Sequence, residues 1–279
     1  MKQLLLATAI ASLLFVGCDK DNDPNDEQNP ETEEVKKLLS RTVFKEVGAT
    51  RSWEIQFVYD SLNRLIRTIH ISKYDLEIYT HTIEFMYNAD DSPAKVKFSW
   101  EQEITFLYNN NQILVINAQT TDTLTKNADG QLVELRSCDD YRVLWIYDVN
   151  GNLTDVTFPN SESNSYNYTY TDVKSVMRHI NASAWFYSLF VAEYTEALFI
   201  TAPTSRGNMV SRFSNGSEIY DMTYELDADG YVKRAHMVIT GDTHSDSPLN
   251  RFINSPTSVR ISKNESQSYE FVFEYILAY

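Results

Sequence analysis

The sequence has little of several features that would point to a particular chemistry. It contains 2 cysteines and 8 glycines in 279 residues. Lysine and arginine total 24 against 39 aspartates and glutamates, which gives a net charge of −15. A chain this acidic lacks the positive surface with which proteins hold nucleic acid, so a nucleic-acid partner is excluded. The apolar run at residues 4–16 is shorter than the roughly 20 residues that a membrane-spanning helix needs.

The first residues have the layout of a secretory signal peptide, assigned to residues 1–17. Lys2 supplies the positive start, the apolar run follows, and the small residue Gly17 precedes Cys18. This ending resembles a bacterial lipoprotein signal, although Phe15 stands where such signals usually have leucine. A cleavable signal followed by an incidental cysteine is the alternative. We predict that Cys18 is lipidated. Its acyl chains would hold the protein on a membrane, since each buried CH₂ contributes about 0.8 kcal/mol of binding free energy.

An acidic segment follows the lipidated cysteine. Residues 19–34 contain no aromatic and no aliphatic residue, so residues 18–37 are predicted to be a disordered tether. An EF-hand calcium loop is excluded because Pro24 and Pro30 occupy its glycine and glutamate positions. The acidic run resembles the surface-export signal of Bacteroidetes lipoproteins, whereas the rule of enteric bacteria would retain the protein at the inner membrane. We expect an exported protein on the outer membrane at the cell surface, with a periplasm-facing protein as the alternative.

Residues 38–279 are predicted to be a single β-rich domain. Trp53, Ile55 and Phe57 alternate with other residues, and this period of two is typical of half-buried antiparallel strands. Four glycines follow Asn or Asp, a pairing that favours the type I′ turn of a tight hairpin. These glycines are Gly130, Gly151, Gly216 and Gly230.

A unit made of an aromatic strand end, an acidic or amide turn and a second strand recurs along the chain. Its copies begin at residues 57–60, 85–88, 106–109, 145–148 and 222–225. Such a unit buries its apolar face only against its neighbours. The predicted fold class is therefore mainly all-β: an antiparallel β-hairpin meander that forms a large curved sheet or a barrel-like structure.

One segment departs from the period of two. Residues 183–198 place apolar side chains at helical spacing, and Pro203 follows as a stop. Most faces of this helix would be apolar, which predicts that it is buried and plugs or caps the sheet.

The motifs of common catalytic and metal sites do not occur in the sequence. No histidine has a second histidine or a cysteine at metal-ligand spacing, and His70 and His81 are expected on different strands. Cys138 has acidic neighbours, which disfavour a reactive thiolate. The five histidines are His70, His81, His179, His236 and His244. We predict no catalytic residue, no metal site and no cofactor. A glycoside hydrolase stays an alternative, because its two carboxylates are recognised by their separation in space.

The repeated unit is similar to the YD repeats of Rhs-type shells. The chain as a whole resembles a Bacteroidetes lipoprotein family of unknown function, the DUF4595 type. This resemblance rests on the lipoprotein start with its acidic tether, the hairpins over residues 50–170, the aromatic segment 185–208 and the hairpin at 224–232. It implies a porin-like β fold and an outer-membrane location, and it brings no catalytic residues.

Two short motifs resemble the O-glycosylation sites of exported proteins of the same lineage, with ordinary turns as the alternative. They are Asp60-Ser61-Leu62 and Asp122-Thr123-Leu124. The last strand, residues 269–279, resembles the final strand of outer-membrane barrels. Elsewhere, however, Lys95 and Lys97 place cations on one strand face. A charge on a lipid face costs about 2–4 kcal/mol at mid-bilayer, so we expect a wall that faces water.

These observations favour a lipid-anchored surface protein without catalytic machinery, which binds a glycan or another extracellular ligand. The chain has 4 Trp and 18 Tyr, whose exposed faces can stack on sugar rings, although most are expected to fill the core. Two or three coplanar exposed aromatic rings would support glycan binding, and the lack of any such set would reject it. The alternative is a structural or assembly partner of an outer-membrane complex, which would use an exposed strand edge.

Overall fold

The structure is a computed structural model, and its described residues belong to one of the two compact units of the chain, Val35–Tyr279. It describes residues 36–74, 76–137, 141–159, 165–181, 183–186, 207–214, 218–241 and 267–278. The predicted signal peptide, Cys18, nearly all of the predicted tether, Cys138 and His244 lie outside the described residues.

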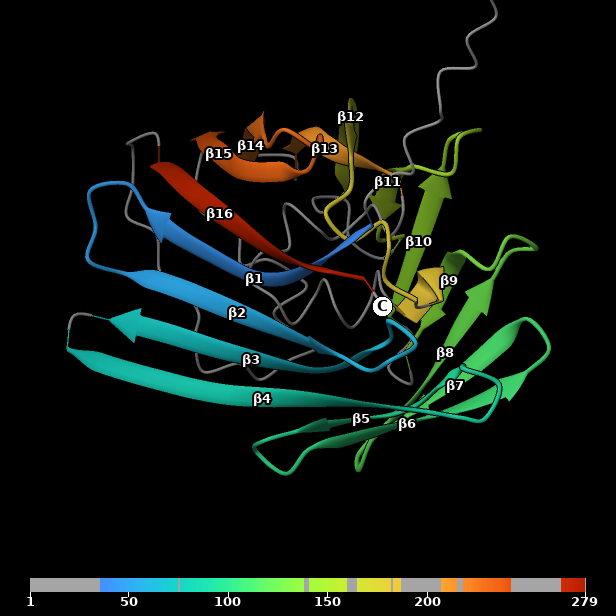
Figure 1. Cartoon of the computed structure of the whole chain (residues 1–279). Helices are drawn as coiled ribbons and strands as arrows, with labels where there is room; N and C mark the ends of the chain where they lie inside the picture. The colour runs from blue at the N-terminus through green and yellow to red at the C-terminus, as the bar shows by residue number, and fades with distance from the viewer. Residues whose placement is uncertain are drawn as a thin grey trace, which may run out of the picture. The chain divides into compact units, whose positions relative to one another are not determined.

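Within the described residues, sixteen strands form one closed barrel (Figure 1). The strands are β1 (Lys37–Glu46), β2 (Ser52–Tyr59), β3 (Leu65–Tyr74), β4 (Glu77–Tyr87), β5 (Pro93–Phe98), β6 (Glu103–Asn109), β7 (Gln112–Ile116), β8 (Thr121–Lys126), β9 (Leu132–Arg136), β10 (Arg142–Tyr147), β11 (Leu153–Thr157), β12 (Tyr166–Lys174), β13 (Asn208–Ser214), β14 (Glu218–Leu226), β15 (Val232–Gly241) and β16 (Gln267–Leu277). One short helix, α1 (Ala184–Phe186), completes the described elements.

Every strand pairs antiparallel with the strands before and after it, so the barrel is a simple meander. The first and last strands close it, with β1 and β16 paired from Lys37 opposite Leu277 to Glu46 opposite Tyr269. These two strands lie side by side in Figure 1. The all-β hairpin meander predicted from the sequence is confirmed, and the sheet, whose closure the sequence left open, closes.

The wall of the barrel is apolar inside and polar outside. On β4, for example, Ile83 and Phe85 are buried, whereas the intervening Glu84 is exposed. All sixteen strands contribute side chains to one continuous hydrophobic core. The period-two pattern of the sequence therefore marks which side chains fill the interior.

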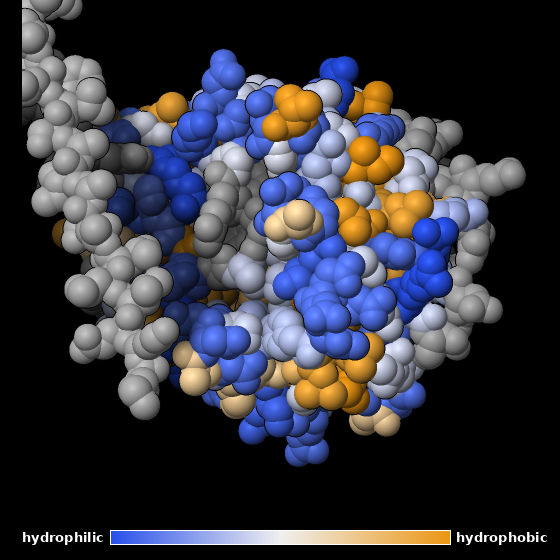
Figure 2. All heavy atoms as spheres, turned by 90° about the vertical axis from the view of Figure 1, so that its right-hand side faces the viewer, coloured by the Kyte–Doolittle hydropathy of each residue, from blue (hydrophilic) through white to orange (hydrophobic). Residues whose placement is uncertain are grey.

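Ion pairs join neighbouring strands on the outer side of this wall. Arg41 on β1 bonds Glu54 on β2 at 2.9 Å and Glu274 on β16 at 2.6 Å. A similar pair joins Lys45 on β1 to Glu270 on β16 at 3.0 Å. Figure 2 shows hydrophilic side chains spread over one face of the molecule, with smaller apolar groups between them. Charges so placed would be costly against a lipid face.

Turns of one geometry follow several of the even-numbered strands. In the turn after β10, the Oδ1 atom of Asp148 accepts hydrogen bonds from the backbone N–H groups of Asn150 (2.8 Å) and Asn152 (2.9 Å). The third residue of that loop, Gly151, has a φ of +80°, and it is followed by a bulge in the ladder. Turns of the same kind begin at Asp60, Asn127 and Asp227.

The prediction of type I′ turns is therefore wrong for the described Asn-Gly and Asp-Gly pairs. A type I′ turn needs two residues with positive φ, whereas the loops of Gly130, Gly151 and Gly230 each have one. The carboxylate or amide just before the loop accepts backbone N–H groups of the loop, and only the third residue after it has a positive φ. The pair Asn215–Gly216 lies outside the described residues.

The helix predicted over residues 183–198 is described only in part, because residues 187–206 lie outside the described residues. Its described part, α1, lies against the inner wall of the barrel. Phe186 is fully buried and meets Phe85 of β4 edge-on at 5.6 Å, and Trp185 meets Phe106 of β6 at 5.3 Å. The described part thus agrees with a segment that plugs the barrel.

No helix among the described residues has both the length and the apolar character needed to cross a membrane.

Candidate functional site

One end of the barrel is a ring of tyrosines, which we call the tyrosine rim. Each of these tyrosines lies on an even-numbered strand, faces inward and donates its hydroxyl to a backbone carbonyl of the preceding strand, at 2.5–2.7 Å. Burial raises the pKa of each hydroxyl, which keeps it protonated as a donor. The members are Tyr59, Tyr87, Tyr108, Tyr170, Tyr224 and Tyr275.

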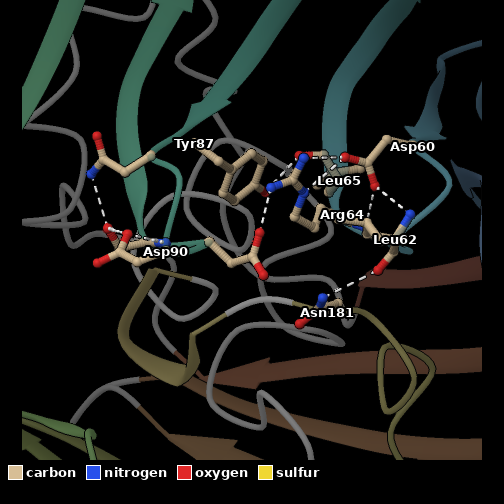
Figure 3. A network of polar contacts seen from close by, with 10 residues as sticks. Asp60, Leu62, Arg64, Leu65, Tyr87, Asp90 and Asn181 are labelled. Atoms are coloured by element: carbon tan, nitrogen blue, oxygen red, sulfur yellow. Dashed lines mark hydrogen bonds and ion pairs between the residues drawn. The ribbon is translucent and has the colours of Figure 1, made fainter.

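Polar contacts connect neighbouring turns along this rim. Arg64 donates to Asp60 at 2.8 Å and to Asp91 at 2.5 Å, and its guanidinium lies 4.9 Å from the ring centre of Tyr87. Figure 3 shows Arg64 near Asp60 and Tyr87, with the Tyr87 hydroxyl directed at Leu65. The β2–β3 turn is thereby fixed to the β4–β5 turn.

Residues 175–181 cross the tyrosine rim after β12. Asn181 donates its backbone N–H to the carbonyl of Asn63 at 3.0 Å and its side-chain amide to the carbonyl of Leu62 at 3.1 Å (Figure 3). Farther around the rim, the guanidinium of Arg178 lies 3.9 Å from the ring centre of Tyr231. The rim is thus occupied by the protein's own side chains, which gives it a structural role.

The opposite end carries a second group of rings, which we call the aromatic strip. Its rings come from the inward faces of β2, β3 and β4 and from the turn between β5 and β6. The members are Trp53, His70, Tyr74, Tyr79, His81 and Trp100.

Two histidines stack at the centre of the aromatic strip. The β3–β4 ladder places His70 directly opposite His81, with ring centres 4.5 Å apart and planes at 17°. His70 is buried and its Nε2 lies 3.0 Å from the Thr68 hydroxyl. Burial lowers the pKa of His70 to about 3, with a smaller contribution from His81, whose own pKa burial also lowers. Both imidazoles are therefore neutral at neutral pH.

The expectation that these two histidines lie on different strands is confirmed, but sequence reasoning missed their contact. The hairpin ends with Tyr74 opposite Glu77, so residues equally distant from this turn face each other. The sequence does not show where this turn lies, because the residues around Leu76 lack the dipeptides that mark tight hairpins. Without the position of the turn, the pairing of His70 with His81 could not be predicted.

Two rings of the aromatic strip are accessible to solvent. Trp100 is 46% exposed and Tyr79 is 54% exposed. Trp100 stacks on the buried Phe98 at 4.8 Å, meets His81 edge-on at 5.4 Å and donates its indole N–H to Gln102 at 3.1 Å. These contacts fix the indole at the end of the barrel while leaving about half of it free.

The exposed rings do not form the coplanar set that would most strongly indicate a sugar platform. Tyr79 meets Tyr74 at 68° with ring centres 6.2 Å apart. The flattest pair of the region, Phe44 and Trp53 at 8°, is buried. The aromatic strip therefore fails the coplanarity criterion for glycan binding, and the argument for a ligand site rests on the exposure of Trp100 and Tyr79 alone.

A polar hollow of about 300 Å³ lies on the outer side of the same turn. Its lining residues are Thr82, Glu84, Lys97, Phe98, Ser99 and Glu101. Glu84 and Glu101 are exposed, and Lys97 lies opposite Glu84 in the β4–β5 ladder. A general acid of a glycosidase needs a carboxyl kept protonated by burial or by a like charge. The hollow supplies two carboxylates without that burial.

The remaining sequence candidates are spread over the barrel. Asp60-Ser61-Leu62 forms the exposed β2–β3 turn, whereas Asp122-Thr123-Leu124 lies within β8 and buries Leu124 in the core. His179 lies at the tyrosine rim, 6.0 Å from Tyr231, and His236 is exposed on β15. Among the residues that the structure describes, no group of three or more His, Cys, Asp or Glu side chains could hold a metal ion.

Comparison with known proteins gives distant structural likeness only. No protein-family model matches the chain, and no curated protein matches it in sequence. A porin-like protein from Bacteroides uniformis ATCC 8492 is 13% identical over 85% of this chain and 96% of that chain, with a TM-score of 0.40. A porin-like protein from Bacteroides vulgatus ATCC 8482 is 10% identical over 86% and 99%, with a TM-score of 0.33. The barrel assignment rests on the strand pairing described above.

Proposed function

We propose that this protein is a lipid-anchored protein of the outer membrane, displayed at the cell surface, that binds a glycan or another extracellular ligand at its aromatic strip. The observation that carries the proposal is the half-exposed indole of Trp100, which Phe98 and Gln102 hold in place. A fixed aromatic face with a polar edge suits a sugar ring, which has apolar faces and polar rims.

The first described strand begins at the end of the barrel that is remote from the aromatic strip. β1 begins at Lys37, beside the end of β16 at Leu277, and the tyrosine of the last strand, Tyr275, belongs to the tyrosine rim. A lipid on Cys18 would therefore be connected to the barrel at the tyrosine rim. The aromatic strip lies at the other end, where a ligand could approach it.

The net charge of the chain narrows the range of glycans that the protein is expected to bind. With a net charge of −15, the protein repels polyanions over several ångströms of solvent. The imidazoles of the aromatic strip are neutral at neutral pH and add no compensating positive charge. We therefore expect an uncharged glycan in preference to an acidic or sulfated one.

Calorimetric titration of residues 35–279 with a panel of neutral and acidic polysaccharides tests the proposal. We expect saturable heat with a neutral class of polysaccharide, and about a fivefold loss of affinity in Trp100→Ala, which corresponds to the roughly 1 kcal/mol of an aromatic contact. Leu107→Ala is the matched control, because Leu107 is 50% exposed on another strand. Heat that is absent throughout, or equal in both variants, would reject the aromatic strip as the binding site.

An assay of reducing sugar on the same mixtures of protein and polysaccharide separates binding from hydrolysis. Release of reducing sugar that disappears in Glu84→Gln or Glu101→Gln would favour the glycoside hydrolase alternative, with the outer hollow as its site. Binding without release of reducing sugar would favour the capture function.

A further inference from the structure

Strand β4 is longer than its neighbour β5. The β3–β4 ladder continues out to Glu77, whereas the β4–β5 ladder begins only where Ile83 lies opposite Phe98. Residues 77–81 of β4 therefore have β3 on one side and, among the described residues, no strand on the other. We call this stretch the β4 edge.

The backbone contacts of Thr82 show which hydrogen-bonding groups of the β4 edge point away from β3. Its carbonyl accepts from the backbone N–H of Ser99 at 2.9 Å and its own N–H donates to the Ser99 hydroxyl at 3.1 Å, so both groups point towards β5. Backbone groups of alternate residues point to the same side of an antiparallel strand. The N–H and C=O groups of Ile78 and Thr80 therefore point outward from the barrel edge.

Exposed apolar side chains accompany these backbone groups. Leu76 is 99% exposed, Ile78 is 65% exposed and Tyr79 is 54% exposed. A strand edge with open backbone groups and apolar side chains is a template for pairing with another strand.

We propose that the β4 edge pairs with the same edge of a second copy of this chain, antiparallel, about a twofold axis at Tyr79. This register places Ile78 opposite the partner's Thr80 in both directions, so all four outward groups of each copy form hydrogen bonds. It also places Glu77 opposite the partner's His81, a carboxylate opposite a neutral imidazole that can donate an N–H to it. The edge is thus complementary to itself in hydrogen bonding.

Other registers centred on an inward-facing residue fit less well. An axis at Glu77 would set two carboxylates opposite each other, which is destabilising. An axis at His81 would require the backbone of Thr82, which Ser99 already occupies. The pairing centred on Tyr79 would bring the two aromatic strips together across the axis. This proposal does not depend on glycan binding.

Disulfide trapping tests the register, in residues 35–279 carrying Cys138→Ser. This unit contains every described strand and both closing strands. Directly opposed residues of a non-hydrogen-bonded pair have Cα atoms about 4.5 Å apart, within the range of a disulfide. We expect Tyr79→Cys to form a dimer under mild oxidation. The matched variant Ile78→Cys should not, because its counterpart lies two residues along the partner strand.

Trapping of Ile78→Cys in place of Tyr79→Cys would overturn this register, and trapping of neither would overturn the pairing. Sedimentation of Thr80→Pro gives an independent measurement. Proline removes an N–H that faces the edge and not β3, so the barrel ladder is preserved. We expect self-association at least tenfold weaker than in Thr80→Val, with an unchanged melting temperature. Equal self-association in both variants, or dimers that survive Thr80→Pro, would also overturn the proposal. Loss of pairing with normal glycan binding would leave the proposed function standing.

Discussion

The two ends of the barrel are built in different ways. At the tyrosine rim, the same hydroxyl-to-carbonyl bond recurs, for example at Tyr59, Tyr87 and Tyr275, and the same turn recurs at Asp60 and Asp148. At the opposite end, the stack of His70 on His81 and the half-exposed Trp100 each occur once. Repetition indicates a structural task that every hairpin shares. The single features of the other end are where a particular ligand or partner can be specified.

The test of this contrast with the largest expected effect removes one ring from each end of the barrel. Phe186→Ala deletes a fully buried ring that packs against Phe85 and, at 6.2 Å, against Tyr87 of the tyrosine rim, and we expect it to lower the free energy of unfolding by about 3–5 kcal/mol. Trp100→Ala removes a half-exposed ring and should cost only about 1 kcal/mol. Urea unfolding followed by circular dichroism measures both. Similar losses in the two variants would contradict the assignment of structure to one end and binding to the other.

The second test is the dependence of stability on pH. The folded protein keeps His70 neutral with a pKa of about 3, whereas the unfolded chain binds a proton at this histidine below about pH 6.5. Falling pH therefore favours unfolding from about pH 6.5 downward, by about 1.4 kcal/mol per pH unit for one proton. Urea midpoints between pH 7 and 4.5 measure this slope.

The control for the pH test comes from the tyrosine rim. Burial opposes ionisation of Asp60, but hydrogen bonds from Arg64 outweigh it and lower the pKa of this carboxyl. Its contribution is present above the unfolded value and is lost only below about pH 4. His70→Gln should therefore reduce the slope between pH 6.5 and 4.5 and leave the part that His81 contributes, since burial also lowers the pKa of His81. A slope that persists unchanged in this variant would mean that other groups titrate there.

The smallest test compares one hydroxyl from each end. Tyr87→Phe leaves the carbonyl of Leu65 without its 2.7 Å hydrogen bond, and we expect a loss of about 1 kcal/mol. Tyr79→Phe removes an exposed hydroxyl that bonds Glu77, and its effect on unfolding should be close to zero. Equal effects on the urea midpoint would show that the tyrosine rim gains nothing from its hydroxyl bonds.

The sequence predicted what local chemistry decides. The recurring aromatic and Asp units predicted the hairpins, because each turn is closed by groups within four residues, as between Asp148 and Asn152. The turn type was wrong, because the Asx side chain changes the backbone preference of the Asn-Gly pair. Closure between β1 and β16 could not be predicted, since it depends on the summed twist and stagger of all strands.

The candidate site was predictable only in part. Exposed aromatic residues were expected, but which of the tryptophans would be exposed depends on where β5 ends. Trp100 is the second residue after the end of β5 at Phe98, and the β4 edge exists only because β4 is longer than β5. Such differences in strand length arise from pairing register, which a single sequence does not display.

Because β1 pairs with β16, the first and last strands of the barrel are neighbours like any other two consecutive strands. Each strand has two partners, and the pair formed by β1 and β16 differs from the others only in having no connecting loop. The order of strands around the barrel is therefore cyclic, and the cut between Leu277 and Lys37 is one choice among sixteen. A circular permutant that joins these ends by a short linker and begins at another turn should retain the same wall.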